Sequence, residues 1–121
     1  MVEALNIDVI DVSNNKLTGS IPDDFDRLKN MTGLSLFFNQ LFGKVSDSID
    51  RLPSLVVLKV FSNNLLGALP HDFERYSMFV EFQVADNKLE GELPKHLCDN
   101  GRLVGAVATP GIFSKVFLKN F

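Results

Sequence analysis

Two histidines, one cysteine and several aspartates are the residues in this chain that could carry out catalysis. His96 and Cys98 could supply a general base and a thiol nucleophile, but no third group is placed to orient the base. Asp23, Asp24 and Asp47 could act as paired carboxylates, although their polar surroundings are typical of solvated turns. The sequence contains neither a glycine-rich phosphate loop nor a recognisable set of metal ligands. We therefore expect no enzymatic activity, no metal and no cofactor.

The composition fits one folded domain that does not bind nucleic acid. The chain has 121 residues, and 45% of them are hydrophobic, which is enough to build a core. Its 12 basic and 15 acidic residues leave no positive stripe that could neutralise phosphates. The single cysteine cannot form an internal disulfide.

The sequence shows neither an export signal nor a membrane anchor. Its first residues lack the basic region and the apolar run of a secretory signal peptide. No stretch approaches the roughly 20 consecutive apolar residues that cross a bilayer. We therefore expect no direct membrane insertion, and we expect the chain to be soluble or to be a segment of a larger protein.

The organising feature of the sequence is an internal repeat of 24 residues. An asparagine marks each repeat, a leucine follows two residues later, and a glycine follows after two more. The asparagines are Asn15, Asn39, Asn63 and Asn87. A proline comes three residues after the glycine, at Pro22, Pro70 and Pro94, and Ser46 takes its place in the second repeat.

The repeat divides the chain into units near residues 7–30, 31–54, 55–78 and 79–102, with a partial fifth unit from residue 103. The fifth unit departs from the pattern, because Gly111 replaces the asparagine and Lys115 replaces the glycine. We therefore predict one repeat domain over 1–108 and a degenerate last coil or tail over 109–121.

Each unit contains a short apolar alternation of the kind that forms a β-strand. In the first unit Ile10 and Val12 should point inward, and Asp11 should face solvent. The regular return stacks the next strand alongside, which predicts a solenoid of about five coils with a curved parallel β-sheet on its concave side. The apolar segments on the convex side are too short for full helices, and they predict 3₁₀ turns or irregular coil.

The repeated asparagines predict a ladder of side-chain hydrogen bonds. Each one lies where the chain leaves its strand, at a place where backbone groups of neighbouring coils lack a partner. A buried amide can both donate and accept a hydrogen bond there. We therefore expect Asn15, Asn39, Asn63 and Asn87 to form an asparagine ladder along the stack of coils.

The pattern of a strand followed by N-x-L-x-G-x-(I/L)-P resembles the plant-specific leucine-rich repeat of receptor-like kinases, receptor-like proteins and polygalacturonase-inhibiting proteins. The resemblance covers residues 7 to about 108. The stretches Leu34–Leu41 and Leu97–Gly105 are similar to repeats in the ectodomains of receptor kinases related to HAESA. The resemblance implies an α/β-class leucine-rich repeat solenoid in a glycoprotein. It also implies a place on the extracellular side of the plasma membrane, as part of a parent protein with a transmembrane helix and a serine/threonine kinase.

The same resemblance implies a non-catalytic module that recognises a secreted peptide or protein ligand, with a co-receptor kinase as a further partner of the full-length protein. Two alternatives stay open. The chain could belong to a secreted defence protein similar to polygalacturonase inhibitors, or it could be a truncated product with only a structural role. A downstream membrane span and kinase would favour the receptor, whereas a short chain that ends in a paired-cysteine cap would favour the inhibitor.

Residues in the outward phase of the predicted strands form columns on the concave face. One column contains Asp11, Ser35, Lys59 and Gln83, and the next contains Phe37 and Phe61, with Phe38 beside them. Exposed aromatic side chains are typical of binding surfaces. The alternative is that Phe37 and Phe61 simply stack on each other across adjacent strands. As a binding surface, this face would contact the ligand, and Lys59 and Gln83 would orient a polar or acidic partner.

Asn30, Met31 and Thr32 form an N-x-T sequon just before the second predicted strand. If the parent protein is secreted, we expect a glycan on Asn30. In a fragment that is not exported, the tripeptide would stay unmodified.

Overall fold

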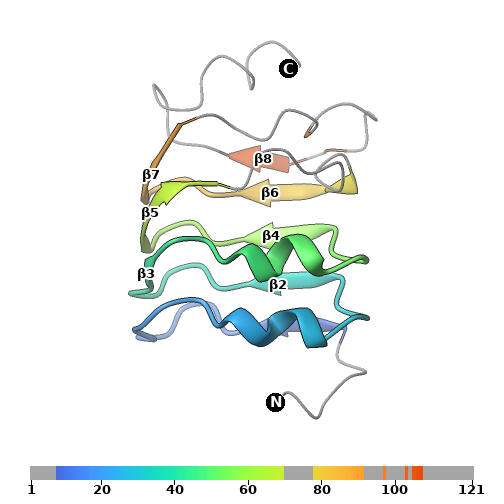
Figure 1. Cartoon of the computed structure of the whole chain (residues 1–121). Helices are drawn as coiled ribbons and strands as arrows, with labels where there is room; N and C mark the ends of the chain where they lie inside the picture. The colour runs from blue at the N-terminus through green and yellow to red at the C-terminus, as the bar shows by residue number, and fades with distance from the viewer. Residues whose placement is uncertain (1–7, 70–77, 92–96, 98–102, 104, 108–121) are drawn as a thin grey trace.

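A computed structural model shows stacked coils, with a five-stranded parallel sheet on one side of the molecule (Figure 1). The structure describes residues 8–69, 78–91, 97, 103 and 105–107. The tail predicted over 109–121 lies outside the described residues, and so do the catalytic candidates His96 and Cys98.

The five-stranded sheet contains one strand from each coil. Its strands, in spatial order, are β1 (Val9–Asp11), β2 (Gly33–Ser35), β4 (Val57–Lys59), β6 (Glu81–Gln83) and β8 (Gly105–Val107). Every neighbouring pair is parallel, and every register is offset by 24 residues, as in Val9 opposite Gly33 and Gly33 opposite Val57. Because this offset equals the repeat, equivalent residues form straight columns across the sheet. The prediction of a parallel sheet is confirmed.

The opposite side of the coils contains two short 3₁₀ helices, η1 (Asp23–Arg27) and η2 (Asp47–Arg51). They are the two coiled segments in front of the sheet in Figure 1. Each helix directs one large apolar residue into the core, Phe25 from η1 and Ile49 from η2. The predicted 3₁₀ turns of the convex side are therefore confirmed. The outer face of the five-stranded sheet is called the concave face below.

A second, three-stranded parallel sheet, which the sequence did not predict, follows the asparagines. It contains β3 (Phe42–Gly43), β5 (Asn64–Ala68) and β7 (Lys88–Glu90), and Figure 1 shows it along one edge of the stack. Its register is offset by 22 residues, as in Phe42 opposite Asn64. The backbone N–H and C=O groups on this edge therefore also find partners between coils.

The core lies between the sheets and the 3₁₀ helices, and it is continuous from coil to coil. The middle residues of the strands, Leu34, Leu58 and Phe82, are almost completely buried. Burial of a side chain of this size contributes about 1.5–3 kcal/mol relative to exposure. No single coil encloses its own apolar residues, so stability depends on contacts between neighbouring coils.

The repeated asparagines join each coil to the coil before it. Asn63 Nδ2 donates to the carbonyl oxygens of Leu36 and Val60, at 3.0 and 3.1 Å, and Oδ1 accepts from the Leu41 N–H. Asn39 and Asn87 make the same set of hydrogen bonds in their own coils. The hydrogen bonds of Asn15 stay within the first coil, where it donates to Val12 and Ser13.

Ser46, which interrupts the repeated proline, caps the helix η2. Its φ of −63° is one that proline also adopts, and its Oγ accepts from the Ser48 N–H at 3.2 Å. The same Oγ donates to Asp23 Oδ1 at 2.7 Å. Ser48 is completely buried and donates to the Pro22 carbonyl at 3.3 Å. The serine therefore replaces the conformational constraint of proline with hydrogen bonds between two coils.

Candidate functional site

The concave face presents three columns of residues that point out of the five-stranded sheet. The first contains Val9, Gly33, Val57 and Glu81, and the second contains Asp11, Ser35, Lys59 and Gln83. The third contains Ser13, Phe37, Phe61 and Ala85 and lies just beyond the strands. Backbone hydrogen bonds extend the register to this third column, from Asn14 to Phe37, from Phe38 to Phe61 and from Ser62 to Ala85.

Three phenylalanines form an aromatic cluster in the third column. The rings of Phe37 and Phe61 are stacked, with centroids 4.4 Å apart and planes at 9°. Phe38 contacts both rings edge-on, at centroid distances of 5.6 and 5.4 Å. The two stacked rings are partly buried, whereas Phe38 is 50% exposed. The stacking considered as an alternative therefore exists, and it leaves an apolar surface open to solvent.

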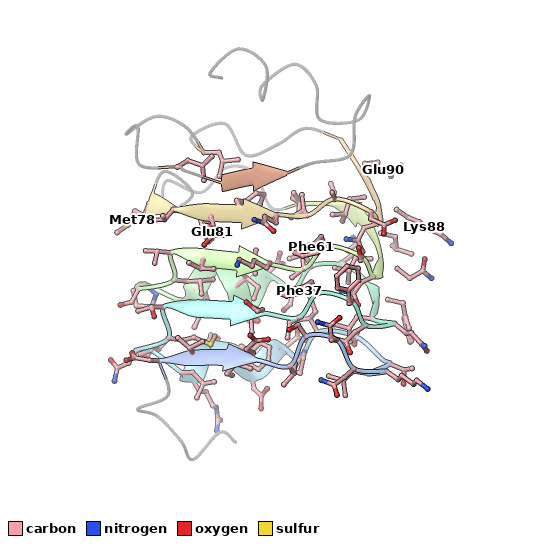
Figure 2. All side chains as sticks on the ribbon, turned by 180° about the vertical axis from the view of Figure 1, so that it is seen from behind. Phe37, Phe61, Met78, Glu81, Lys88 and Glu90 are labelled. Atoms are coloured by element: carbon pink, nitrogen blue, oxygen red, sulfur yellow. The ribbon has the colours of Figure 1, made fainter. Side chains whose placement is uncertain are left out.

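The position of the cluster is visible in Figure 2. Phe37 and Phe61 lie beyond the carboxyl ends of the strands, on the side where Lys88 and Glu90 of the second sheet lie. Met78 lies at the opposite edge of the sheet, and Glu81 lies near the start of β6. The aromatic cluster is therefore at the end of the concave face that adjoins the second sheet.

Phe38 has an unusual backbone conformation. Its φ is +55°, and the equivalent residues of the other coils, Asn14, Ser62 and Asp86, also have positive φ. Asparagine and aspartate tolerate this left-handed region, whereas a bulky side chain there is rare and costs roughly 1–2 kcal/mol. The position is thus fixed by the repeat, and a large aromatic residue occupies it at a cost in stability. Strain of this kind is often found at functional sites.

Glu81 is a member of the concave surface that the sequence reasoning missed. Its Oε2 lies 3.2 Å from Lys59 Nζ and accepts a hydrogen bond of 3.3 Å from Gln83 Nε2. Its place two residues before Gln83 in the outward phase was the signal that could have revealed it. Lys59 and Gln83 were expected to orient an acidic partner, but both are already engaged by this carboxylate.

Asp11 presents an ionised carboxylate at the first coil. Its Oδ1 accepts hydrogen bonds from the Ser13 Oγ at 2.6 Å and from the Ser13 N–H at 3.0 Å. These two hydrogen bonds, with a smaller contribution from the positive charge of Lys59, hold the pKa of Asp11 below its ordinary value. Asp11 is exposed, so this charge faces solvent on the concave side.

Ser35 is less accessible than its place in the outward phase predicts. It lies between Asp11 and Lys59 in the second column, and only 9% of it is exposed. Its short side chain is flanked by two longer ones, which leaves little of it for a ligand to contact. The expectation that Ser35 offers an open binding surface is therefore corrected.

Asn30 is exposed at the turn between η1 and β2. Thr32 of the same sequon contacts the Asp8 carbonyl through its hydroxyl, at 3.3 Å. Asn30 precedes β2 by three residues, as Met78 precedes β6. Because Figure 2 places Met78 at the edge opposite the aromatic cluster, the repeat puts Asn30 at that same opposite edge.

Within the described ranges, no three side chains of histidine, cysteine, aspartate or glutamate gather where they could hold a metal ion. Asp23 and Asp47, considered above as carboxylates, lie on the convex side, where Asp23 accepts from Ser46. The part of the chain that the structure describes also has no helix long and apolar enough to cross a membrane.

Comparisons with known proteins point to one kind of repeat. The family model described as Leucine Rich Repeat matches residues 6–28. No curated protein sequence matches the chain. Among solved structures, a TDR receptor is 36% identical with a TM-score of 0.81 over 88% of this chain. The ectodomain of the Arabidopsis receptor kinase HAESA, bound to an N-terminally extended IDA peptide hormone, is 35% identical with a TM-score of 0.73 over 84%.

A second HAESA structure, in complex with the peptide hormone IDA and the co-receptor SERK1, is 28% identical with a TM-score of 0.78 over 84% of this chain. The chain spans only 18% of the TDR receptor structure and 17% of each HAESA structure. The repeat register, the 3₁₀ helices and these likenesses identify the chain as a leucine-rich repeat solenoid of the plant type, similar to the ectodomains of HAESA-related receptor kinases.

Proposed function

We propose that this chain is a non-catalytic recognition module from the extracellular part of a plant receptor-like kinase, and that its concave face binds a secreted peptide. The observation that carries the proposal is the aromatic cluster of Phe37, Phe38 and Phe61. Large aromatic side chains that stay open on one face are the residues that most often anchor a partner.

The likeness to receptor structures supports the same function. The HAESA structures contain the peptide hormone IDA, and one of them also contains the co-receptor SERK1. By analogy, the parent of this chain would bind a peptide outside the cell and would then associate with a co-receptor kinase. Its described coils would form only part of the binding surface, because the chain spans less than a fifth of those receptors.

The dimensions of the sheet fit an extended peptide. Five parallel strands about 4.8 Å apart span roughly 19 Å, and an extended peptide advances about 3.3 Å per residue. About six ligand residues would therefore cross the concave face. Asp11, Lys59, Glu81 and Gln83 would contact the polar groups of such a peptide, and the aromatic cluster would contact an apolar surface of one side chain.

We also propose that Asn30 carries a glycan in the secreted parent protein. Asn30 is exposed, and its place at the edge opposite the aromatic cluster supports a glycan that does not cover the binding surface.

A peptide-binding experiment on the full chain tests the proposal. The immobilised protein is screened with a synthetic library of random hexapeptides, and the retained peptides are then measured by titration calorimetry. Replacing Phe37 and Phe61 together by serine should weaken binding at least tenfold, which is about 1.4 kcal/mol. Asp24→Ser, a change of an exposed residue on η1, should leave the affinity unchanged.

A folding control is needed because the two rings are stacked and partly buried. Loss of the stack should lower the free energy of unfolding by about 0.5–1.5 kcal/mol, which a denaturation curve measures. If the double variant folds and keeps its affinity while Asp24→Ser loses it, the concave face is not the binding surface.

A further inference from the structure

We propose that the concave face selects a peptide with a basic side chain, arginine in particular, which lies against one end of the Phe37–Phe61 stack. This inference rests on the proposed function, because it names the kind of peptide that the same surface would select. It reverses the expectation, drawn from Lys59 and Gln83, that the ligand is acidic.

The orientation of the two rings leaves one face of each directed along the stack of coils. Their centroid distance of 4.4 Å is close to the spacing of neighbouring strands, about 4.8 Å, so the ring planes lie across the direction in which the coils stack. In the same column, Ser13 precedes Phe37 and Ala85 follows Phe61. Both neighbours have short side chains. The outer face of each ring therefore adjoins a small residue, which leaves room for a side chain of the ligand.

A carboxylate stands beside each end of this stack. Asp11 lies two residues before Ser13, and its Oδ1 is held by the side chain and N–H of Ser13. Its Oδ2 has no hydrogen-bond partner among the residues that the structure describes. At the other end, Asp86 follows Ala85 and accepts a hydrogen bond of 2.9 Å from the Ser62 hydroxyl.

The nearest positive charge on this face does not cancel these carboxylates. Lys59 lies in the second column, where Glu81 Oε2 is 3.2 Å from its ammonium nitrogen. The concave face thus has three carboxylates, those of Asp11, Glu81 and Asp86, and one ammonium in its described residues. The surface around the aromatic stack is therefore negative overall, and it complements a cation.

Arginine matches this combination of groups better than other side chains. Its guanidinium is planar and can stack on an aromatic face while its N–H groups donate to a carboxylate. The side chains of Asp11 and Phe37 are diagonal neighbours on adjacent coils, within reach of a single long side chain. A lysine would be attracted by the charge, but it would lack the planar stacking surface, and a glutamate would be repelled.

The test compares four hexapeptide pools on the immobilised full chain. In every pool the third position is fixed, as arginine, citrulline, lysine or glutamate, and the other five positions are mixed. Citrulline has the shape of arginine without its charge. The arginine pool should be retained at least tenfold more than the citrulline pool, with lysine between them and glutamate lowest.

Variants of the protein locate the effect. Asp11→Asn keeps an acceptor oxygen for Ser13 but removes the charge, so it should reduce the preference for arginine over citrulline at least threefold. Asp86→Asn should also reduce it. Asp24→Asn makes the same change of charge on the convex side and should leave the preference unchanged.

The outcomes separate this inference from the proposed function. If arginine and citrulline pools are retained equally, and both are lost when Phe37 and Phe61 are replaced by serine, the face binds peptides but does not select arginine. If the preference for arginine survives Asp11→Asn and Asp86→Asn, its assignment to the aromatic stack is wrong. If the serine double variant retains every pool as well as the wild type, or if no pool is retained by any protein, the proposed function fails as well.

Discussion

The amide oxygen of Asn63 accepts a hydrogen bond of 3.0 Å from the backbone N–H of Leu41, which lies on the preceding coil. The amide nitrogen of the same residue donates to the carbonyl oxygens of Leu36, Val60 and Phe61. One side chain therefore pairs four backbone groups from two coils. Because those groups point into the turn between the two sheets, no strand partner is available to replace the asparagine.

Replacing Asn63 by alanine should lower the free energy of unfolding by roughly 1–3 kcal/mol, because the backbone groups would stay buried without partners. Asn64→Ala is the matched control, since Asn64 is exposed on β5. It should change stability by less than about 0.5 kcal/mol. Chemical denaturation of both variants measures the difference, and equal midpoints would contradict a structural role for Asn63.

Phe38→Asn should separate stability from recognition. The substitution relieves the left-handed strain of a bulky residue, worth roughly 1–2 kcal/mol, but removes the edge contacts with Phe37 and Phe61, worth about 0.5–1.5 kcal/mol. The two effects should cancel to within about 1 kcal/mol in a denaturation curve, while binding of the retained hexapeptides weakens.

Phe42→Asn is the matched control for Phe38→Asn. Phe42 is 52% exposed on β3, outside the three concave columns, so its replacement should leave peptide binding unchanged. A Phe38→Asn variant that is much less stable than the wild type and binds peptides normally would assign Phe38 to folding alone.

The five-stranded sheet could be predicted from the sequence because each strand contains an apolar alternation that repeats at one interval. The second sheet could not be predicted in the same way. Its strands are two to five residues long, and two of them contain a glycine with positive φ, Gly43 and Gly67. Glycine ordinarily argues against a strand. Pairing between coils overrides that preference here, because it satisfies backbone groups on the edge of the stack.

The columns of the concave face followed from the period of two, whereas the contacts within them depend on side-chain rotamers. The stacking of Phe37 on Phe61 and the contacts of Lys59 and Gln83 with Glu81 belong to this second kind. The positive φ of Phe38 left a trace in the sequence, since Asn14 and Asp86 stand at the same place in their units. Residues of these types favour the left-handed region, and the pattern was obscured by the phenylalanine.

Restoring the repeat proline at position 46 should destabilise the protein. Proline fits the φ of −63°, but it removes the helix cap of η2 and the hydrogen bond to Asp23. We expect a loss of about 0.5–2 kcal/mol in the free energy of unfolding. Ser46→Ala should cost more than Ser46→Pro, because alanine lacks the conformational restriction of proline in the unfolded chain. A Ser46→Pro variant more stable than the wild type would show that the hydrogen bonds of Ser46 contribute little.

A glycan on Asn30 should be detectable when the chain is secreted from a eukaryotic cell behind an added signal peptide. The intact mass should fall after treatment with a glycosidase, and Asn30→Gln should abolish that difference. Thr32→Ser keeps the sequon and should keep the glycan, whereas Thr32→Ala should lose it. The glycosylated and unglycosylated proteins should bind hexapeptides equally. A secreted wild-type protein with the mass of the bare chain would refute modification at Asn30.

The ion pair between Asp26 and Arg51 should make stability depend on acidity. Arg51 Nε donates to Asp26 Oδ2 at 2.8 Å, and this hydrogen bond lowers the pKa of the Asp26 carboxyl. A carboxyl with a lowered pKa in the folded state stabilises that state above its unfolded pKa, about 4 for aspartate, and loses this effect as the pH falls through the folded pKa. Arg51→Gln should therefore lower the Tm slightly at neutral pH, since the pair is largely exposed.

The difference in Tm between the wild type and Arg51→Gln should shrink as the pH falls below about 4, and it should disappear once Asp26 is protonated in the folded protein. Lys16→Gln, which removes a positive charge from an exposed residue of the first coil, corrects for the general effect of charge. Its difference from the wild type should not follow the titration of Asp26. Thermal unfolding followed by circular dichroism between pH 2 and pH 7 measures both variants. If the difference for Arg51→Gln stays constant or grows as the pH falls, the pair between the two 3₁₀ helices does not stabilise the folded chain.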